Sequence, residues 1–167
     1  MVQVIIALLA ALAQSAAPAP PPCTAAQYHA LDFWLGDWDV TNRAGTKVFG
    51  TNHVASEERG CLVHEFWTSK TGATGQSFNF VDDTTLKWVH VWVGEGTTYR
   101  FEGNPVGGNL VLHGDNRIPG TADIVKWEAT WSQEPGGLVR KFWRYSKDGG
   151  ATWTVFLDGW YRRRPAQ

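Results

Sequence analysis

The sequence from Leu31 to Val40 reads LDFWLGDWDV and marks a boundary between two kinds of composition. Beyond Gly36, short segments rich in Val, Thr, Phe, Tyr and Trp alternate with clusters of Gly, Asn and Asp. β-Branched and aromatic side chains suit a pleated, half-buried strand, whereas Gly, Asn and Asp suit tight turns. The chain beyond Gly36 is therefore predicted to be antiparallel β structure.

We expect about ten strands, joined by short turns rather than by helix-length crossovers. Their predicted ranges are Trp38–Asn42, Lys47–Glu57, Leu62–Ser69, Gln76–Val81, Lys87–Gly94, Thr97–Glu102, Asn109–His113, Asp123–Ser132, Leu138–Ser146 and Thr152–Arg162. A meander of this kind closes most simply into an all-β, antiparallel up-and-down barrel over residues 31–164, and a two-sheet β-sandwich is the alternative. Only Thr24–Leu31 has a helical pattern, and it is short.

The composition agrees with one well-packed domain. The chain has 167 residues, 10 of them Trp, and its 15 Lys+Arg against 16 Asp+Glu give a net charge of -1. Phosphate binding needs clustered positive charge, and the one basic run is Arg162 to Arg164 near the end of the chain. We therefore do not expect a nucleic-acid partner.

The first residues are predicted to be a targeting segment. Residues 1–31 contain no Asp, Glu, Lys or Arg, and Val2 to Ala13 is an apolar run that ends in small residues. This pattern is typical of a secretory signal peptide over residues 1–16, and the run is too short for a membrane anchor. Residues 17–30 then combine a Pro/Ala-rich tether with the short helix. We expect a periplasmic or secreted protein with no stable membrane span after signal cleavage.

The two cysteines, Cys23 and Cys61, are predicted to form a disulfide, because a pair of cysteines in an exported chain most simply does so. Chain-entropy estimates for a loop of this length give roughly 4 kcal/mol of stabilisation. The alternative is two free or metal-bound thiols. No CxxC or paired Cys/His spacing favours metal.

The Gly-x-Trp of Gly36 and Trp38, at the start of the first predicted strand, resembles the opening motif of lipocalins and other calycins. That resemblance implies a barrel with a ligand cavity, in which Trp38 plugs the closed end and one of Arg162, Arg163 or Arg164 stacks on it. The string FWLGDWDV, with GCLVHEFW (60–67) and SKDGGATW (146–153), is also similar to a family of small exported bacterial proteins of unassigned function. A calycin resemblance does not imply which ligand is bound.

The haem-binding nitrobindins share the short helix, the Gly-x-Trp opening and a ten-strand barrel, so a haem-binding barrel is an alternative function. Their proximal histidine lies near the C-terminal end of the barrel. Here residues 155–167 contain no His. We therefore predict no cofactor.

One turn has a recognisable design. Residues 146–153 match the Asp-box pattern S-x-D-x-G-x-T-W, in which the oxygens of Ser146 and Asp148 bond backbone N–H groups, Gly150 takes a positive φ and Trp153 folds under the turn. A single copy without a repeat does not make a propeller. We interpret these residues as a structural hairpin staple.

Candidate pocket residues follow from strand alternation, since residues two apart share a face. We expect a set of polar groups flanked by large aromatic side chains to face the cavity: Glu65, Trp67, Asn79, Trp88, His90 and Trp92. Parity alone leaves open which face points inward. The main hypothesis is a calycin-like protein that binds a small hydrophobic or aromatic molecule.

Catalysis is the alternative, with Glu65 and His90 as the acid and base of an isomerase or hydrolase. We favour a non-catalytic function in which these two groups satisfy each other and orient a ligand. The string HEFWT (64–68) lacks the second His of HExxH, so we expect no metal, and there is no nucleophile elbow or dinucleotide motif. A third possibility, a sugar- or protein-binding surface, requires Trp127, Trp131 and Trp143 to be exposed in a row.

Overall fold

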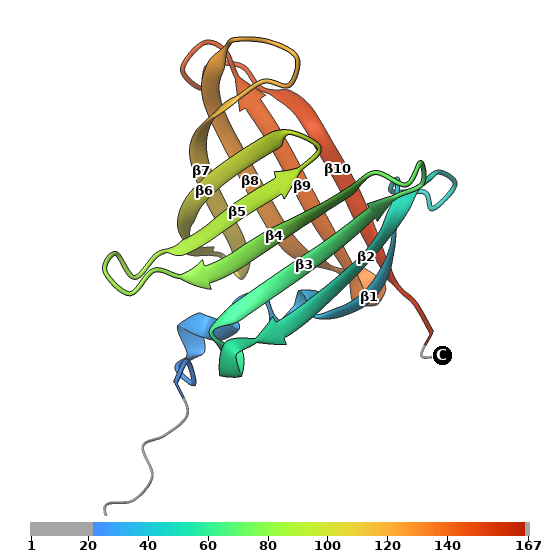
Figure 1. The fold of residues 1–167 in the computed structure, drawn as a ribbon, viewed down its shortest axis with the longest axis vertical. Helices are drawn as coiled ribbons and strands as arrows, with labels where there is room; N and C mark the ends of the chain where they lie inside the picture. Colours follow the sequence, from blue (N-terminus) through green and yellow to red (C-terminus); the bar gives the residue numbers. More distant parts are fainter. Residues whose placement is uncertain (1–21, 166–167) are drawn as a thin grey trace, which may run out of the picture.

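Residues 22–165, which the computed structural model describes, form ten antiparallel strands that close into a barrel (Figure 1). The strands are β1 (Gly36–Thr41), β2 (Val48–Glu57), β3 (Leu62–Ser69), β4 (Thr74–Val81), β5 (Trp88–Gly94), β6 (Thr97–Val106), β7 (Asn109–Arg117), β8 (Ile124–Glu134), β9 (Leu138–Ser146) and β10 (Thr154–Arg163). Each strand pairs with the next along the chain, and β10 pairs with β1. The predicted up-and-down barrel is confirmed, and the sandwich is excluded.

The predicted strand bounds differ most in the β6–β7 hairpin, where both strands run about four residues further than expected. Gly103, Asn104 and Pro105, which follow the predicted strand end at Glu102, are poor strand residues. In the structure Gly103 lies so close to β7 that a Cβ at this position would collide with the carbonyl oxygen of Val111. A glycine inside the strand thus allows the close approach instead of ending the strand.

The expected short N-terminal helix is present, but it is a 3-10 helix and is shorter than the predicted Thr24–Leu31. Two short 3-10 helices occupy this region, η1 (Ala26–His29) and η2 (Asp32–Trp34), with two further 3-10 turns at η3 (Glu58–Gly60) and η4 (Pro135–Gly137). Leu31 lies between η1 and η2, has non-helical backbone angles (φ -112°, ψ 8°) and is buried. Its packing into the core interrupts the helix that the local sequence alone would continue.

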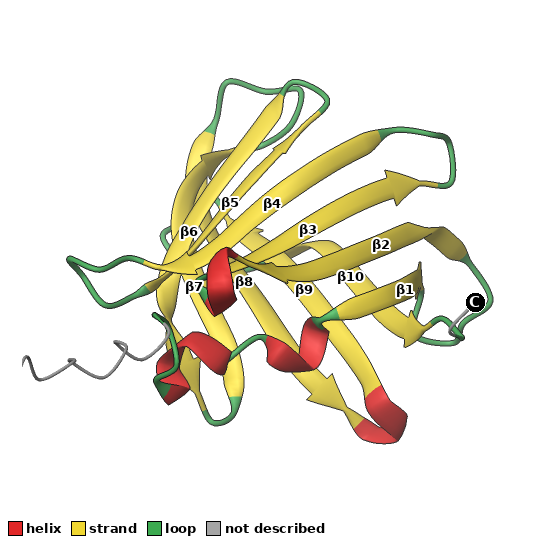
Figure 2. Cartoon of the chain, turned by 60° about the horizontal axis from the view of Figure 1, so that its bottom comes forward, coloured by secondary structure: helices red, strands yellow, loops and turns green. Residues whose placement is uncertain are grey.

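The 3-10 helices η1 and η2 lie across one end of the barrel and close it (Figure 2). The indole Nε1 of Trp38 donates to the carbonyl oxygen of Trp34 at 2.8 Å, and Nε1 of Trp88 donates to the carbonyl oxygen of Gln27 at 2.8 Å. Trp34 and Trp38 are both fully buried. The closed end is therefore fixed by hydrogen bonds as well as by aromatic packing.

The Gly-x-Trp motif has the arrangement that its calycin resemblance implies. Of the three C-terminal arginines, Arg163 lies over Trp38, with its guanidinium carbon 4.3 Å from the ring centroid, and it donates to the carbonyl oxygen of Leu35 at 3.1 Å. Gly36 has φ +121°, and a side chain there would collide with the Arg163 guanidinium. The turn at Gly36, the packing of Trp38 in the closed end and the position of the Arg163 guanidinium thus depend on one another.

The predicted disulfide is confirmed, since Cys23 and Cys61 are bonded. Cys61 follows η3 at the β2–β3 connection, so the bond ties the segment before η1 to the closed end of the barrel. The predicted signal peptide, residues 1–16, and most of the Pro/Ala-rich tether lie outside the described residues.

The Asp-box residues lie in the β9–β10 connection. Ser146 Oγ accepts from the backbone N–H of Gly150 at 2.7 Å, and Asp148 accepts from both the N–H (2.8 Å) and the hydroxyl (2.6 Å) of Thr152. These bonds hold the pKa of Asp148 well below its ordinary value. Trp153 is half-buried, with the guanidinium of Arg144 over its ring at 4.5 Å.

Candidate functional site

A cavity of about 400 Å³ occupies the half of the barrel away from η1 and η2. Half of the residues that line it are aromatic: Phe49, Trp67, Trp92, Tyr99, Trp143, Phe156 and Tyr161. Glu95 and Thr97, beside the β5–β6 turn, and Pro119, in the β7–β8 loop, stand at its mouth. The loops at this end lie opposite the end of the barrel that carries η1 and η2 (Figure 1).

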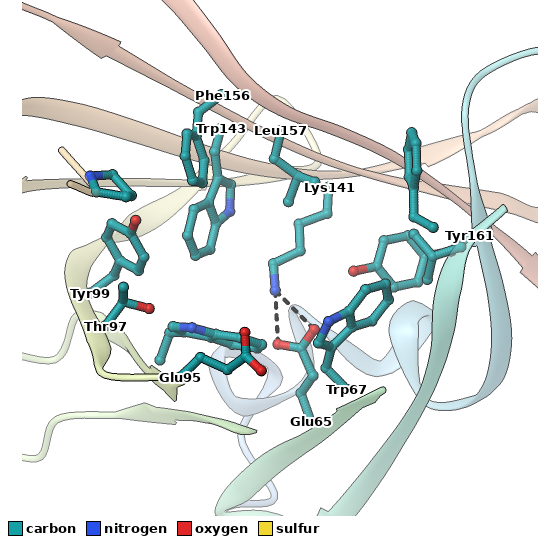
Figure 3. A pocket seen from close by; sticks show the side chains of 14 residues that line it. Glu65, Trp67, Glu95, Thr97, Tyr99, Lys141, Trp143, Phe156, Leu157 and Tyr161 are labelled. Atoms are coloured by element: carbon teal, nitrogen blue, oxygen red, sulfur yellow. Dashed lines mark hydrogen bonds and ion pairs between the residues drawn. The ribbon is translucent and has the colours of Figure 1, made fainter. Parts of the chain in front are cut away.

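A buried ion pair lies at the inner end of the cavity. Lys141 on β9 extends across the barrel to Glu65 on β3, with Nζ 2.8 Å from Oε2 and 3.0 Å from Oε1 (Figure 3). The side chains are 3% and 2% exposed, respectively. Burying two charges is costly unless they are paired and hydrogen-bonded, and here they are both.

The carboxylate of Glu65 has two further donors. Asn52 Nδ2 on β2 donates to Oε1 at 2.7 Å, and Ser77 Oγ on β4 donates to Oε2 at 2.5 Å. An ionised carboxylate offers about four acceptor positions. Each oxygen thus has one donor from Lys141 and one from a neutral side chain, which leaves the carboxylate saturated.

A chain of hydrogen bonds leads from Glu65 toward the closed end. Asn79 Nδ2 donates to Ser77 Oγ at 3.0 Å and to the carbonyl oxygen of Val63 at 2.9 Å, and Asn79 Oδ1 lies 2.6 Å from His90 Nδ1. Because the Asn79 amide nitrogen already donates twice, its oxygen must accept from His90. The network therefore assigns the proton of His90 to Nδ1.

The other ring nitrogen of His90 is an isolated acceptor. Nε2 has no hydrogen-bond partner among the described residues, and the rings of Phe101, Trp131 and Trp143 lie 5.0 to 5.8 Å from the imidazole centroid. Burial, with the nearby Lys141 ammonium, holds the pKa of His90 well below its ordinary value. His90 is thus a neutral imidazole packed among aromatic rings.

Four tryptophans surround the ammonium of Lys141. Its Nζ lies 5.0 to 5.6 Å from the ring centroids of Trp34, Trp92, Trp131 and Trp143. Ring faces attract a desolvated cation at this range, so the cage and Glu65 together replace part of the hydration that Lys141 loses. Burial lowers the pKa of Lys141, and the contact with Glu65 opposes that change.

A β-bulge shapes the mouth. The register of β10 against β9 shifts between Val155 and Leu157, so Phe156 is the extra residue. It lines the cavity, with its ring 4.9 Å from that of Trp127 and 6.1 Å from that of Tyr99. Burial raises the pKa of Tyr99 to about 12. The bulge therefore adds an aromatic ring to the wall near the solvent.

The six predicted pocket residues divide into two groups. Glu65, Trp67 and Trp92 line the cavity. The other three, Asn79, Trp88 and His90, are buried deeper in the barrel and are not part of its wall. Glu65 and His90 do not bond directly, because Ser77 and Asn79 stand between them. Glu65 and His90 therefore belong to one hydrogen-bond network, but they are not a direct acid-base pair at the cavity.

Sequence reasoning missed Lys141, Tyr161 and Asn52. Alternation along Leu138–Ser146 puts Lys141 on one face with Val139 and Trp143, and this pattern is a signal for an inward lysine. Arg140 and Arg144 on the opposite face obscured it, because both faces then carry a cation. Asn52 and Tyr161 become recognisable only through contacts between distant strands.

Other functional alternatives find little support. Trp127, Trp131 and Trp143 are at most 3% exposed, so they form no external row for sugars or proteins. Within residues 22–165, no group of three or more His, Cys, Asp or Glu side chains is placed to hold a metal ion. The described cavity wall contains no His, Cys or Met, and of the usual haem ligands it offers only the tyrosines Tyr99 and Tyr161.

The described helices are all too short to cross a membrane. No protein-family model matches this sequence, and a search of curated proteins finds no match.

Proposed function

We propose that this protein is an exported, calycin-like binding protein that encloses a small hydrophobic or aromatic molecule. The observation that carries the proposal is the cavity of about 400 Å³ inside a closed barrel, walled by aromatic side chains around a few polar groups. Small-molecule sites have this size and this character. The ring faces of Trp67, Trp92 and Trp143 offer stacking surfaces for a flat molecule.

The polar network favours binding over catalysis. Glu65 is saturated by four hydrogen bonds, and His90 is separated from the cavity wall. A general base must reach the proton that it abstracts from a bound substrate. Neither group is available for this in the arrangement described, whereas both contribute to a fixed binding site.

Export is supported by two features. Residues 1–16 have the pattern of a signal peptide, and the bond between Cys23 and Cys61 is of a kind that persists in oxidising compartments. The test is expression of the full chain in a Gram-negative host, followed by fractionation and N-terminal sequencing. We expect periplasmic protein that begins near residue 14 or 17; an intact cytoplasmic chain would contradict export.

Ligand binding is tested with a neutral fluorescent probe, N-phenyl-1-naphthylamine, which brightens in apolar sites. We expect saturable binding at one site per chain. Leu157→Trp, which fills part of the cavity, should abolish it, and Ile124→Trp, at an exposed position of β8, should not. Absence of binding to the wild-type protein, or equal binding to both variants, would contradict the proposal.

A further inference from the structure

The inner end of the cavity has more hydrogen-bond donors than acceptors. Its polar floor, defined as the polar groups of Glu65, Lys141 and Tyr161, lines the cavity (Figure 3). The only acceptor of full charge there is the Glu65 carboxylate, and its oxygens already receive four hydrogen bonds from within the protein. The floor therefore has no strong acceptor left for a ligand.

Two donors on this floor have hydrogen atoms without an acceptor among the described residues. The ammonium of Lys141 has three N–H groups and makes two bonds, both to Glu65. The hydroxyl oxygen of Tyr161 accepts from Asn52 Nδ2 at 3.3 Å, and its own hydrogen has no partner in the described network.

The charge of the floor is balanced. Glu65 and Lys141 form a neutral pair, and burial raises the pKa of Tyr161, so that its phenol is uncharged. A ligand carboxylate beside this pair would leave one net negative charge in a buried site, which is costly. An uncharged acceptor adds no charge and still satisfies the donors.

We infer that the ligand carries an uncharged carbonyl group, as in an aromatic ketone, aldehyde, ester or quinone, and that its oxygen is bound by the donors of Lys141 and Tyr161. A carbonyl oxygen has two lone pairs and can accept from both. The aromatic body of the ligand then lies between the walls toward the mouth. This inference rests on the proposed function, because it assigns a ligand class to the same cavity.

One buried acceptor does not fit this pattern directly. Asn52 Oδ1 has no partner in the described part of the chain, but Asn52 is not part of the cavity wall. It lies behind Tyr161, to which its amide nitrogen donates. Lys141 and Tyr161 line the cavity and Asn52 does not, so the donors of Lys141 and Tyr161 select the polar group of the ligand.

The inference is tested with three naphthalenes that differ only in the substituent at position 2: ethyl, acetyl and carboxylate. Their affinities are measured by displacement of N-phenyl-1-naphthylamine. A missing hydrogen-bond partner costs on the order of tenfold in affinity. We expect 2-acetylnaphthalene to bind about tenfold more tightly than 2-ethylnaphthalene and more tightly than 2-naphthoate.

A conservative variant locates the preference. Tyr161→Phe removes one donor and keeps the ring, so we expect the advantage of the acetyl compound to fall about fivefold while the affinity for 2-ethylnaphthalene stays the same. Tyr145→Phe, which removes a hydroxyl outside the cavity wall, should change neither value. Unchanged binding of 2-ethylnaphthalene also shows that the variant has folded.

The possible failures are distinguishable. Equal affinities for the ethyl and acetyl compounds, or tightest binding of the carboxylate, would overturn the carbonyl inference and leave the proposed function standing. An acetyl preference that survives Tyr161→Phe unchanged would overturn the assigned position of the oxygen. If the probe itself binds poorly and none of the three compounds displaces it, the result would contradict the proposed function itself.

Discussion

The ammonium of Lys141 bridges both carboxylate oxygens of Glu65 inside the barrel, 76 residues away along the chain. The two strands that carry them, β3 and β9, are not neighbours in the sheet. The pair therefore links opposite sides of the barrel wall. It also fixes the boundary between the packed closed end and the cavity.

Removing one partner of this pair should be much worse than removing both. Lys141→Met leaves Glu65 charged and buried, so we expect the free energy of unfolding to fall by about 3–5 kcal/mol. Adding Glu65→Gln should recover a large part of that loss, because no buried charge remains. Urea unfolding of the two single variants and the double variant measures this. Additive losses in the double variant would contradict the coupling.

The stability of the protein should depend on pH through His90. Its pKa is well below the ordinary value in the folded state, so on acidification the unfolded chain takes up a proton that the folded chain does not. The free energy of unfolding should therefore rise with pH up to about pH 6.5 and then level off. His90→Asn, which keeps a donor toward Asn79, should flatten this rise. An unchanged slope in the variant would contradict the assignment.

The disulfide should account for a measurable share of the stability. Replacing Cys23 and Cys61 together by Ser should lower the free energy of unfolding by about 2–5 kcal/mol, because the unfolded chain gains freedom. A reductant should bring the wild-type protein to the same value and leave the double variant unaffected. Equal stability of the oxidised and reduced wild-type protein would be the contrary result.

Arg163 should matter more than its neighbour Arg164. Arg163 covers Trp38 and bonds a carbonyl oxygen, whereas Arg164 makes one exposed ion pair with Asp39 at 3.5 Å. We expect Arg163→Ala to cost about 1–3 kcal/mol and Arg164→Ala less than about 1 kcal/mol, by thermal and urea unfolding. Equal losses would mean that the stacking on Trp38 contributes nothing.

The barrel could be predicted from the sequence because the patterns that specify its strands and turns are local. Turn residues and the alternation of side chains specify strands and hairpins, and consecutive hairpins leave few topologies other than a closed meander. The helix over Thr24–Leu31 is shorter than predicted for a reason that is not local. Leu31 leaves the helical conformation to pack into a core formed by strands far along the chain.

The site was only partly predictable for the same reason. Alternation placed Glu65, Trp67 and Trp92 on one face, and these three do line the cavity. Alternation says nothing about which strands face one another across a barrel, so the partner of Glu65 was expected to be His90. In the structure, Lys141 takes that place, and His90 is reached only through Ser77 and Asn79.

A crystal structure of the protein soaked with 2-acetylnaphthalene tests most directly whether the cavity binds a ligand. We expect electron density for one flat molecule between the aromatic walls, with the carbonyl oxygen within hydrogen-bond distance of Lys141 Nζ and Tyr161 Oη. A barrel interior filled by its own side chains, with no density for the compound, would contradict the account.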